Sequence, residues 1–140
     1  MEVVTQSALE TQELGEKMGR DLRVNNSKPK VICLYGELGS GKTTFVQGLA
    51  KGWGIKKRVT SPTFVFVKLY QPDFYHVDLY RIEKKVEAKN LGLEEIFNEP
   101  QVLVVIEWAE KMKEILPWER QDINFEYLVE NQRRITFKTK

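Results

Sequence analysis

The sequence predicts an α/β fold with a mixed β-sheet, and three observations favour it. The segments 30–35 (KVICLY) and 101–108 (QVLVVIEW) are almost wholly apolar, as is typical of strands buried on both faces. Strand and helix patterns alternate in the first part of the chain, whereas strand patterns dominate the last part. At 140 residues, we expect residues 1–140 to form one domain, with helices flanking the sheet.

The first helix has the clearest local pattern. Ser7 is its expected N-cap because Glu10 follows at the capping-box spacing. Leu14, Met18 and Leu22 then repeat at intervals of four residues, which places them on one helix face. The helix is expected to end near residue 25, before the polar segment that leads to the strand at 30–35.

Turn residues and apolar patterns set the remaining elements. Pro62 lies in a loop before a strand that ends near residue 70, and a turn at 71–73 predicts its hairpin partner. In chain order, the other expected elements are a strand at 2–6, a helix from 42 that Gly52 and Gly54 end, a strand at 74–81, a helix at 86–99 broken near Gly92, a strand at 101–108, a short helix at 109–116, and a C-terminal β-hairpin of 122–129 with 133–139.

Composition excludes several protein classes. The apolar share of 41% and the charged share of 30% are typical of globular chains, and no segment has the length of a membrane span. A net charge of +2 does not argue for nucleic-acid binding, and Lys56–Arg58 are interpreted as a solvated loop. The single cysteine, Cys33, fits a reducing compartment and is interpreted as a core residue. Without a recognisable signal peptide, we expect a cytoplasmic protein.

The segment 36–43 (GELGSGKT) matches the phosphate-binding loop pattern G-x-x-x-x-G-K-[ST] in full. Glycines let the backbone approach phosphate oxygens closely, and the loop amides with the next helix N-terminus attract anions. Lys42 is expected to reach the β- and γ-phosphates, and the Thr43 hydroxyl to join Mg²⁺. The pattern therefore predicts a P-loop nucleotide site that takes ATP and Mg²⁺.

Two carboxylates are candidates for the metal site. Glu107 ends the apolar strand in the Walker-B arrangement, at the sheet edge where α/β proteins bind ligands. Asp78 is the second candidate, because we expect it near a hairpin tip. His76 is interpreted as a packed or hydrogen-bonded histidine, since Mg²⁺ prefers oxygen ligands.

Adenine is the expected base, because the sequence lacks the N-K-x-D pattern of guanine-specific P-loop proteins. The segment 60–64 (TSPTF) has the composition of a switch loop that senses a γ-phosphate. Taken alone, it is more typical of a polar turn that enters a strand.

Taken together, these motifs resemble the bacterial TsaE family, formerly called YjeE. The segments GELGSGKTTF, SPTF, HVDLYR, LGLEEIF and VIEWAEK occur in the family's order and approximate spacing, and ETQELG and RRITF extend the resemblance to nearly the whole chain. Ser40 stands where alanine is usual. The resemblance implies a P-loop ATPase that serves tRNA threonylcarbamoyladenosine (t6A) synthesis.

The resemblance also implies roles for individual residues. Lys42, Asp78 and Glu107 would be catalytic, and Thr43, Glu107 and Asp78 would hold the metal. Thr63 would lie in a switch loop with Ser61 and Pro62, and Trp108 would either pack or contact the nucleotide. The residues expected to bind the nucleotide are Thr11, Glu37, Leu38, Gly39, Ser40, Gly41, Lys42, Thr43, Thr44, Thr63, Trp108 and Arg133, with Thr11 and Arg133 near the base.

The implied partner is the TsaB–TsaD heterodimer, which the protein would reset between turnovers by hydrolysing ATP, with tRNA contacted at most indirectly. Two alternatives stay open: a nucleotide-gated interaction module with incidental hydrolysis, and a small P-loop kinase. The sequence does not predict the oligomeric state, the general base or the docking surface.

Overall fold

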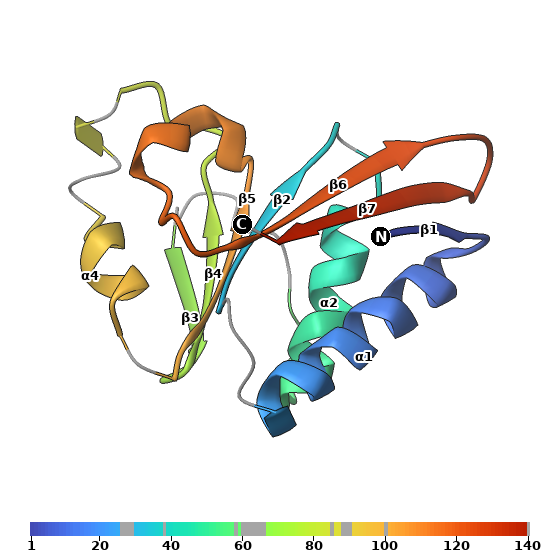
Figure 1. Ribbon diagram of the computed structural model, residues 1–140, viewed down its shortest axis with the longest axis horizontal. Coiled ribbons are helices and arrows are strands. Elements are labelled where there is room, and N and C mark those ends of the chain that lie inside the picture. The colour runs from blue at the N-terminus through green and yellow to red at the C-terminus, as the bar shows by residue number, and fades with distance from the viewer. Residues whose placement is uncertain are drawn as a thin grey trace.

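The computed structural model describes residues 1–25, 30–37, 39–57, 59, 67–84, 86–87, 91–99 and 101–139. Its strands form one seven-stranded sheet in the order β1-β7-β6-β2-β5-β4-β3 (Figure 1). In chain order the elements are β1 (Glu2–Thr5), α1 (Ala8–Asn25), β2 (Val31–Tyr35), α2 (Lys42–Trp53), β3 (Val67–Gln71), β4 (Phe74–Asp78), α4 (Leu93–Phe97), β5 (Leu103–Glu107), the 3-10 helix η1 (Ala109–Ile115), β6 (Gln121–Tyr127) and β7 (Arg133–Thr139).

The sheet is parallel in its centre and antiparallel at both edges. The neighbours β6, β2, β5 and β4 run parallel to one another. At the edges, β1 pairs antiparallel with β7, β7 with β6, and β3 with β4. The predicted mixed α/β sheet and its C-terminal hairpin are therefore confirmed.

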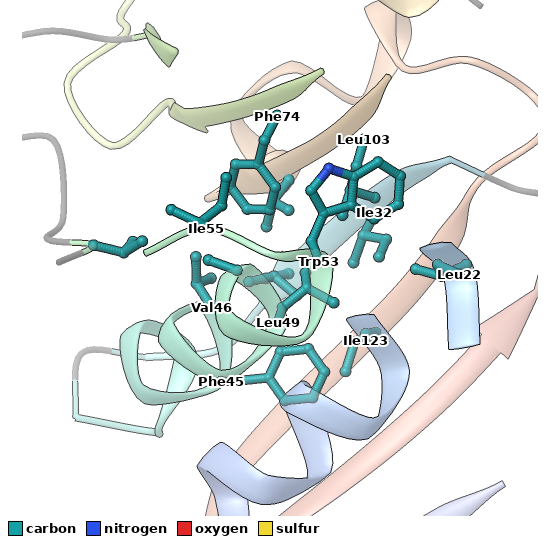
Figure 2. Packing of buried hydrophobic residues seen from close by; sticks show 14 of the residues in the cluster. Leu22, Ile32, Phe45, Val46, Leu49, Trp53, Ile55, Phe74, Leu103 and Ile123 are labelled. Carbon is teal, nitrogen blue, oxygen red and sulfur yellow. The ribbon is translucent and has the colours of Figure 1, made fainter. Parts of the chain in front are cut away.

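Helices cover both faces of the sheet, because alternate residues of the central strands are apolar on both sides. Ile32 and Leu34 of β2 pack toward α1 and α2, whereas Val31 and Cys33 pack toward α4 and η1. Figure 2 shows the first of these two cores, in which Trp53 of α2 lies among sheet residues such as Leu103. Burial on both faces explains why these strands read as continuous apolar runs.

The helices α1 and α2 pack with their backbones close together. A Cβ atom built on Gly48 would lie 1.9 Å from the Gln12 carbonyl oxygen, and one on Gly52 would lie 2.0 Å from the Glu16 carbonyl oxygen. The expectation that Gly52 ends the second helix is therefore wrong. Gly52 lies inside α2, where its missing side chain admits α1, and Gly54 forms the C-cap with positive φ.

One further element differs in detail from the sequence expectation, and another agrees with it. The segment after β5 is a 3-10 helix with a non-helical Met112, not an α-helix. The break expected near Gly92 is confirmed, because Gly92 has positive φ and precedes α4. Among the described residues, no helix is long and apolar enough to cross a membrane.

Candidate functional site

The turn between β2 and α2 needs glycine at three points. Gly39 and Gly41 have φ angles of 80° and 103°, a conformation that other residues rarely adopt. A Cβ atom on Gly36 would lie 2.6 Å from the Phe125 carbonyl oxygen. The turn ends at α2, whose first helical hydrogen bond runs from the Phe45 N–H to the Gly41 carbonyl. The sequence thus folds into a tight loop that leads into a helix N-terminus, the geometry that receives phosphate.

Lys42 is held inside this loop. Its side chain is buried, and its ammonium donates a hydrogen bond to the Gly36 carbonyl. The same ammonium lies 3.7 Å from the centre of the Trp108 ring. Burial lowers the pKa of Lys42, while the nearby carboxylates of Glu107, Glu110 and Asp78 act in the opposite direction. A cation in such a setting attracts an anion strongly, because little water screens it.

The two predicted metal carboxylates lie at the same edge of the sheet. Asp78 and Glu107 are the last residues of β4 and β5 and are direct partners in the parallel register. Glu107 is buried, and the Asp78 carboxylate accepts a 2.9 Å hydrogen bond from the Tyr80 N–H. Burial raises the pKa of Asp78; the Tyr80 hydrogen bond opposes this effect and Glu107 adds to it.

The expectation that Asp78 lies near a hairpin tip is wrong. The tip of the β3–β4 hairpin is at Pro72 and Asp73, at the amino end of β4, whereas Asp78 lies at the carboxyl end. This difference places Asp78 beside Glu107, because parallel strands deliver their carboxyl ends to one edge of the sheet.

The structure confirms the interpretation of His76 as a hydrogen-bonded histidine. Its Nε2 lies 2.6 Å from the Glu107 Oε2, and both side chains are buried. Within the described part of the chain, no group of three or more His, Cys, Asp or Glu residues could hold a metal ion. The metal site expected from the sequence would therefore use two carboxylates, with Thr43 in the first turn of α2, a set that suits a Mg²⁺ ion because Mg²⁺ keeps waters and phosphate oxygens.

A small cavity of about 50 Å³ lies beside the loop at Gly41. It joins α1, the loop and β7, since a Cβ on Gly41 would lie 3.7 Å from the Thr11 Cγ2 and 3.6 Å from the Arg133 Cγ. The buried Arg133 Nε has no hydrogen-bond partner among the described residues. The full lining is Ala8, Thr11, Gly41, Thr44, Asn131 and Arg133.

The remaining predicted site residues are placed as follows. Glu37 is exposed at the loop, whereas Ser40 is buried and its hydroxyl has no partner among the described residues. Trp108 has a φ of 60° and packs against the Tyr80 ring at 5.0 Å between ring centres. Leu38, Thr63 and the segment 61–62 lie outside the described residues.

Three site neighbours were not predicted from the sequence: Tyr80, Ala8 and Asn131. Tyr80 follows Asp78 by two residues, so its position in the segment HVDLYR was the available signal. Ala8 and Asn131 carried no signal, because the packing of α1 and the β6–β7 turn beside the loop brings them there.

Comparison with known proteins identifies the family. The family model described as "Threonylcarbamoyl adenosine biosynthesis protein TsaE" matches residues 5–135. The chain belongs to the TsaE family. This TsaE-family chain is thus part of the system that makes threonylcarbamoyladenosine in tRNA, as the resemblance implied.

Individual relatives of this TsaE-family chain agree. The tRNA threonylcarbamoyladenosine biosynthesis protein TsaE of Bacillus subtilis is 44% identical over 76% of this chain and 68% of its own. The protein of the same name from Treponema pallidum is 36% identical over 97% of this chain and 98% of its own. The crystal structure of Bacillus subtilis YdiB superposes with a TM-score of 0.77 and 32% identity, covering 99% of this chain and 84% of that one.

Proposed function

We propose that this TsaE-family chain is a Mg²⁺-dependent ATPase that acts on the TsaB–TsaD heterodimer during t6A synthesis. The observation that carries the proposal is one arrangement at the edge of the sheet. A buried lysine, Lys42, lies in a glycine-rich loop, and the carboxylates of Asp78 and Glu107 end the neighbouring strands β4 and β5. Its electrostatic parts are those of a P-loop triphosphatase.

Different residues of the chain would bind the phosphates and the metal. Lys42 and the loop amides of residues 39–43 would hold the phosphates, while Thr43, Asp78 and Glu107 would hold Mg²⁺. When bound, the metal would supply positive charge to the phosphate oxygens. Trp108 covers the Lys42 ammonium with an aromatic face, which keeps water from part of that cation and strengthens its attraction for phosphate.

We propose that the base lies against the mouth of the small cavity beside Gly41. Thr11 and Arg133 line it, and the Nε–H of Arg133, which has no hydrogen-bond partner in the described part of the chain, would be a donor for a base or ribose. Thr44 lines the same cavity from the first turn of α2. These contacts would orient the nucleotide but would do no chemistry.

Hydrolysis is proposed to be slow in the isolated chain and faster on the TsaB–TsaD complex. P-loop proteins commonly gain a transition-state cation from a second protein, with rate effects of about 10³ to 10⁵. The role of hydrolysis would be to reset TsaB–TsaD between turnovers, in the cytoplasm and without direct recognition of the tRNA.

Phosphate release from ATP with Mg²⁺ tests this proposal, measured for the chain alone and with purified TsaB–TsaD. Lys42→Ala removes the phosphate-binding cation, and Lys51→Ala is the matched control because Lys51 is exposed on the same helix. Partner-stimulated release that Lys42→Ala abolishes and Lys51→Ala retains supports the ATPase. Intact ATP binding without release in any mixture would instead favour a nucleotide-gated interaction module, and transfer to an acceptor other than water would favour a kinase.

A further inference from the structure

His76 is the single histidine of the chain, and it is fully buried in the sheet beside the proposed metal site. We propose that His76 is a positioning residue, whose Nε2–H orients the Glu107 carboxylate for Mg²⁺. The inference rests on the proposed function, in which Glu107 is a metal ligand. It adds that His76, on the neighbouring strand β4, sets the orientation of that carboxylate.

The strand register explains why this contact forms. His76 and Asp78 are two residues apart on β4, so their side chains leave the same face of the sheet. Glu107 lies opposite Asp78 on the parallel strand β5, and His76 lies opposite Val105. The imidazole therefore reaches diagonally to Glu107, with 2.6 Å between Nε2 and Oε2.

Burial makes this hydrogen bond consequential. The side chains of His76 and Glu107 are 0% and 4% exposed, so water offers little replacement for a lost partner. A buried carboxylate without a donor is unfavourable and turns toward whatever donor remains. With Oε2 held by His76, the carboxylate has one orientation, which leaves Oε1 as the oxygen that His76 does not engage.

The surroundings of the ring favour a single imidazole orientation. Tyr70 stacks on it with 6.3 Å between ring centres and 28° between ring planes. The Nδ1 atom is buried without a hydrogen-bond partner among the described residues. A lone pair tolerates that position better than an N–H group does, so the geometry assigns the proton to Nε2, facing the carboxylate.

Two substitutions separate positioning from packing. His76→Gln keeps a nitrogen donor near the position of Nε2, whereas His76→Phe keeps the ring shape and removes the donor. For each protein we would measure the affinity for ATP in EDTA and with saturating Mg²⁺, and take the ratio as the metal-dependent gain. Loss of a residue that orients a metal ligand typically costs about 10- to 100-fold in metal affinity.

We expect His76→Phe to lose about tenfold or more of the metal-dependent gain while its affinity in EDTA is unchanged, and His76→Gln to retain the gain. A gain in His76→Phe equal to that of the wild type would overturn the inference, as would an equal loss of affinity in EDTA and in Mg²⁺. If the wild type itself gains no ATP affinity from Mg²⁺, the proposed function fails. If the wild type and His76→Phe gain equally, the inference about His76 fails and the proposed function stands.

A second measurement, by NMR, uses the wild-type protein and so does not depend on whether a variant folds. Because the chain has one histidine, ¹⁵N-labelled histidine gives an NMR spectrum with a single imidazole. We expect the Nε2-protonated tautomer, with its N–H proton shifted downfield by the short hydrogen bond to Glu107. An Nδ1-protonated tautomer, or an imidazole N–H that exchanges rapidly with water, would overturn the inference.

Discussion

The Lys42 ammonium is held between the Gly36 carbonyl and the face of the Trp108 indole, 3.7 Å from the ring centre. The lysine that the loop offers to phosphate is thus already engaged by an oxygen and by an aromatic ring. Phosphate oxygens that take the ammonium would weaken its contact with Trp108, since a charge-assisted hydrogen bond is stronger than a cation–π contact.

Trp108 should therefore report nucleotide binding. We expect ATP with Mg²⁺ to change the tryptophan emission of the wild type and to leave that of Trp108→Phe unchanged. Trp118→Phe is the control and should keep the emission change, because Trp118 is 85% exposed, whereas the Trp108 ring lies against the Lys42 ammonium. A fluorescence titration with ATP and Mg²⁺ measures the change for each protein. An emission change that persists in Trp108→Phe would contradict this prediction.

Arg133 should matter for the base and not for the phosphates. Arg133→Ala removes the Nε–H donor from the cavity beside Gly41. We therefore expect ATP affinity to fall by about tenfold, or about 1.4 kcal/mol, while the affinity for inorganic triphosphate, which has no base, stays the same. Arg134→Ala is the matched control, since Arg134 pairs with Glu2 and Glu126. Calorimetric titration of both ligands measures the difference; an equal loss for both would place Arg133 at the phosphates instead.

Gly52→Ala should destabilise the protein although alanine is the better helix former. Intrinsic propensity alone would stabilise α2 by about 1 kcal/mol. The new Cβ would lie 2.0 Å from the Glu16 carbonyl oxygen, so the helices must separate, at a net cost of about 2 kcal/mol or more. Urea unfolding measures the change.

The neighbouring Lys51→Ala is the control for this experiment. Its side chain is 66% exposed and lies 4.0 Å from Glu16, so we expect a change within about 0.5 kcal/mol. A midpoint for Gly52→Ala at or above that of the wild type would mean that α1 and α2 do not pack as described.

Cys33 should make the protein less stable in alkali. Burial, with a further contribution from Asp122, raises the pKa of the Cys33 thiol from 9.0 to about 12. The unfolded chain therefore releases the thiol proton at lower pH than the native chain, so the stabilising contribution is complete below pH 9.0 and is lost as pH rises toward about 12.

Cys33→Ala tests this contribution. We expect it to lower stability by about 1 kcal/mol at neutral pH through lost packing, and to show a smaller decline with rising pH than the wild type. Burial also raises the pKa of Tyr35, and Cys33 adds to that rise, so Cys33→Ala removes the thiol together with its effect on Tyr35. The difference between the urea unfolding free energies of the two proteins is the measurement. Parallel declines in the two proteins would refute the assignment.

Much of the site was predictable because its parts are local in sequence. The loop from Gly36 to Thr43 is contiguous, so its glycine spacing alone predicted the tight turn and the lysine. Glu107 was predictable for a similar reason, since a carboxylate at the end of an apolar strand must emerge at the sheet edge. The capping of α1 by Ser7, whose hydroxyl accepts a 3.1 Å hydrogen bond from the Glu10 N–H, is another local feature.

The errors arose where a residue's neighbour lies far along the chain. The sequence predicts that Gly52 ends a helix, because glycine is common just after a helix. A glycine inside a helix that another backbone packs against gives the same local pattern. Asp78 was assigned to a hairpin tip, because the parallel pairing of β4 with β5 cannot be read from the hairpin alone.

The sequence by itself determined the chain of local elements, the phosphate loop and the carboxylate that ends β5, because each depends on residues within a few positions of one another. Only the tertiary structure decided that His76 holds Glu107, that Thr11 and Arg133 share a cavity with Gly41, and that Trp108 covers Lys42. All of these contacts join residues at least 30 positions apart, and sheet order and helix packing, not local propensity, bring such residues together.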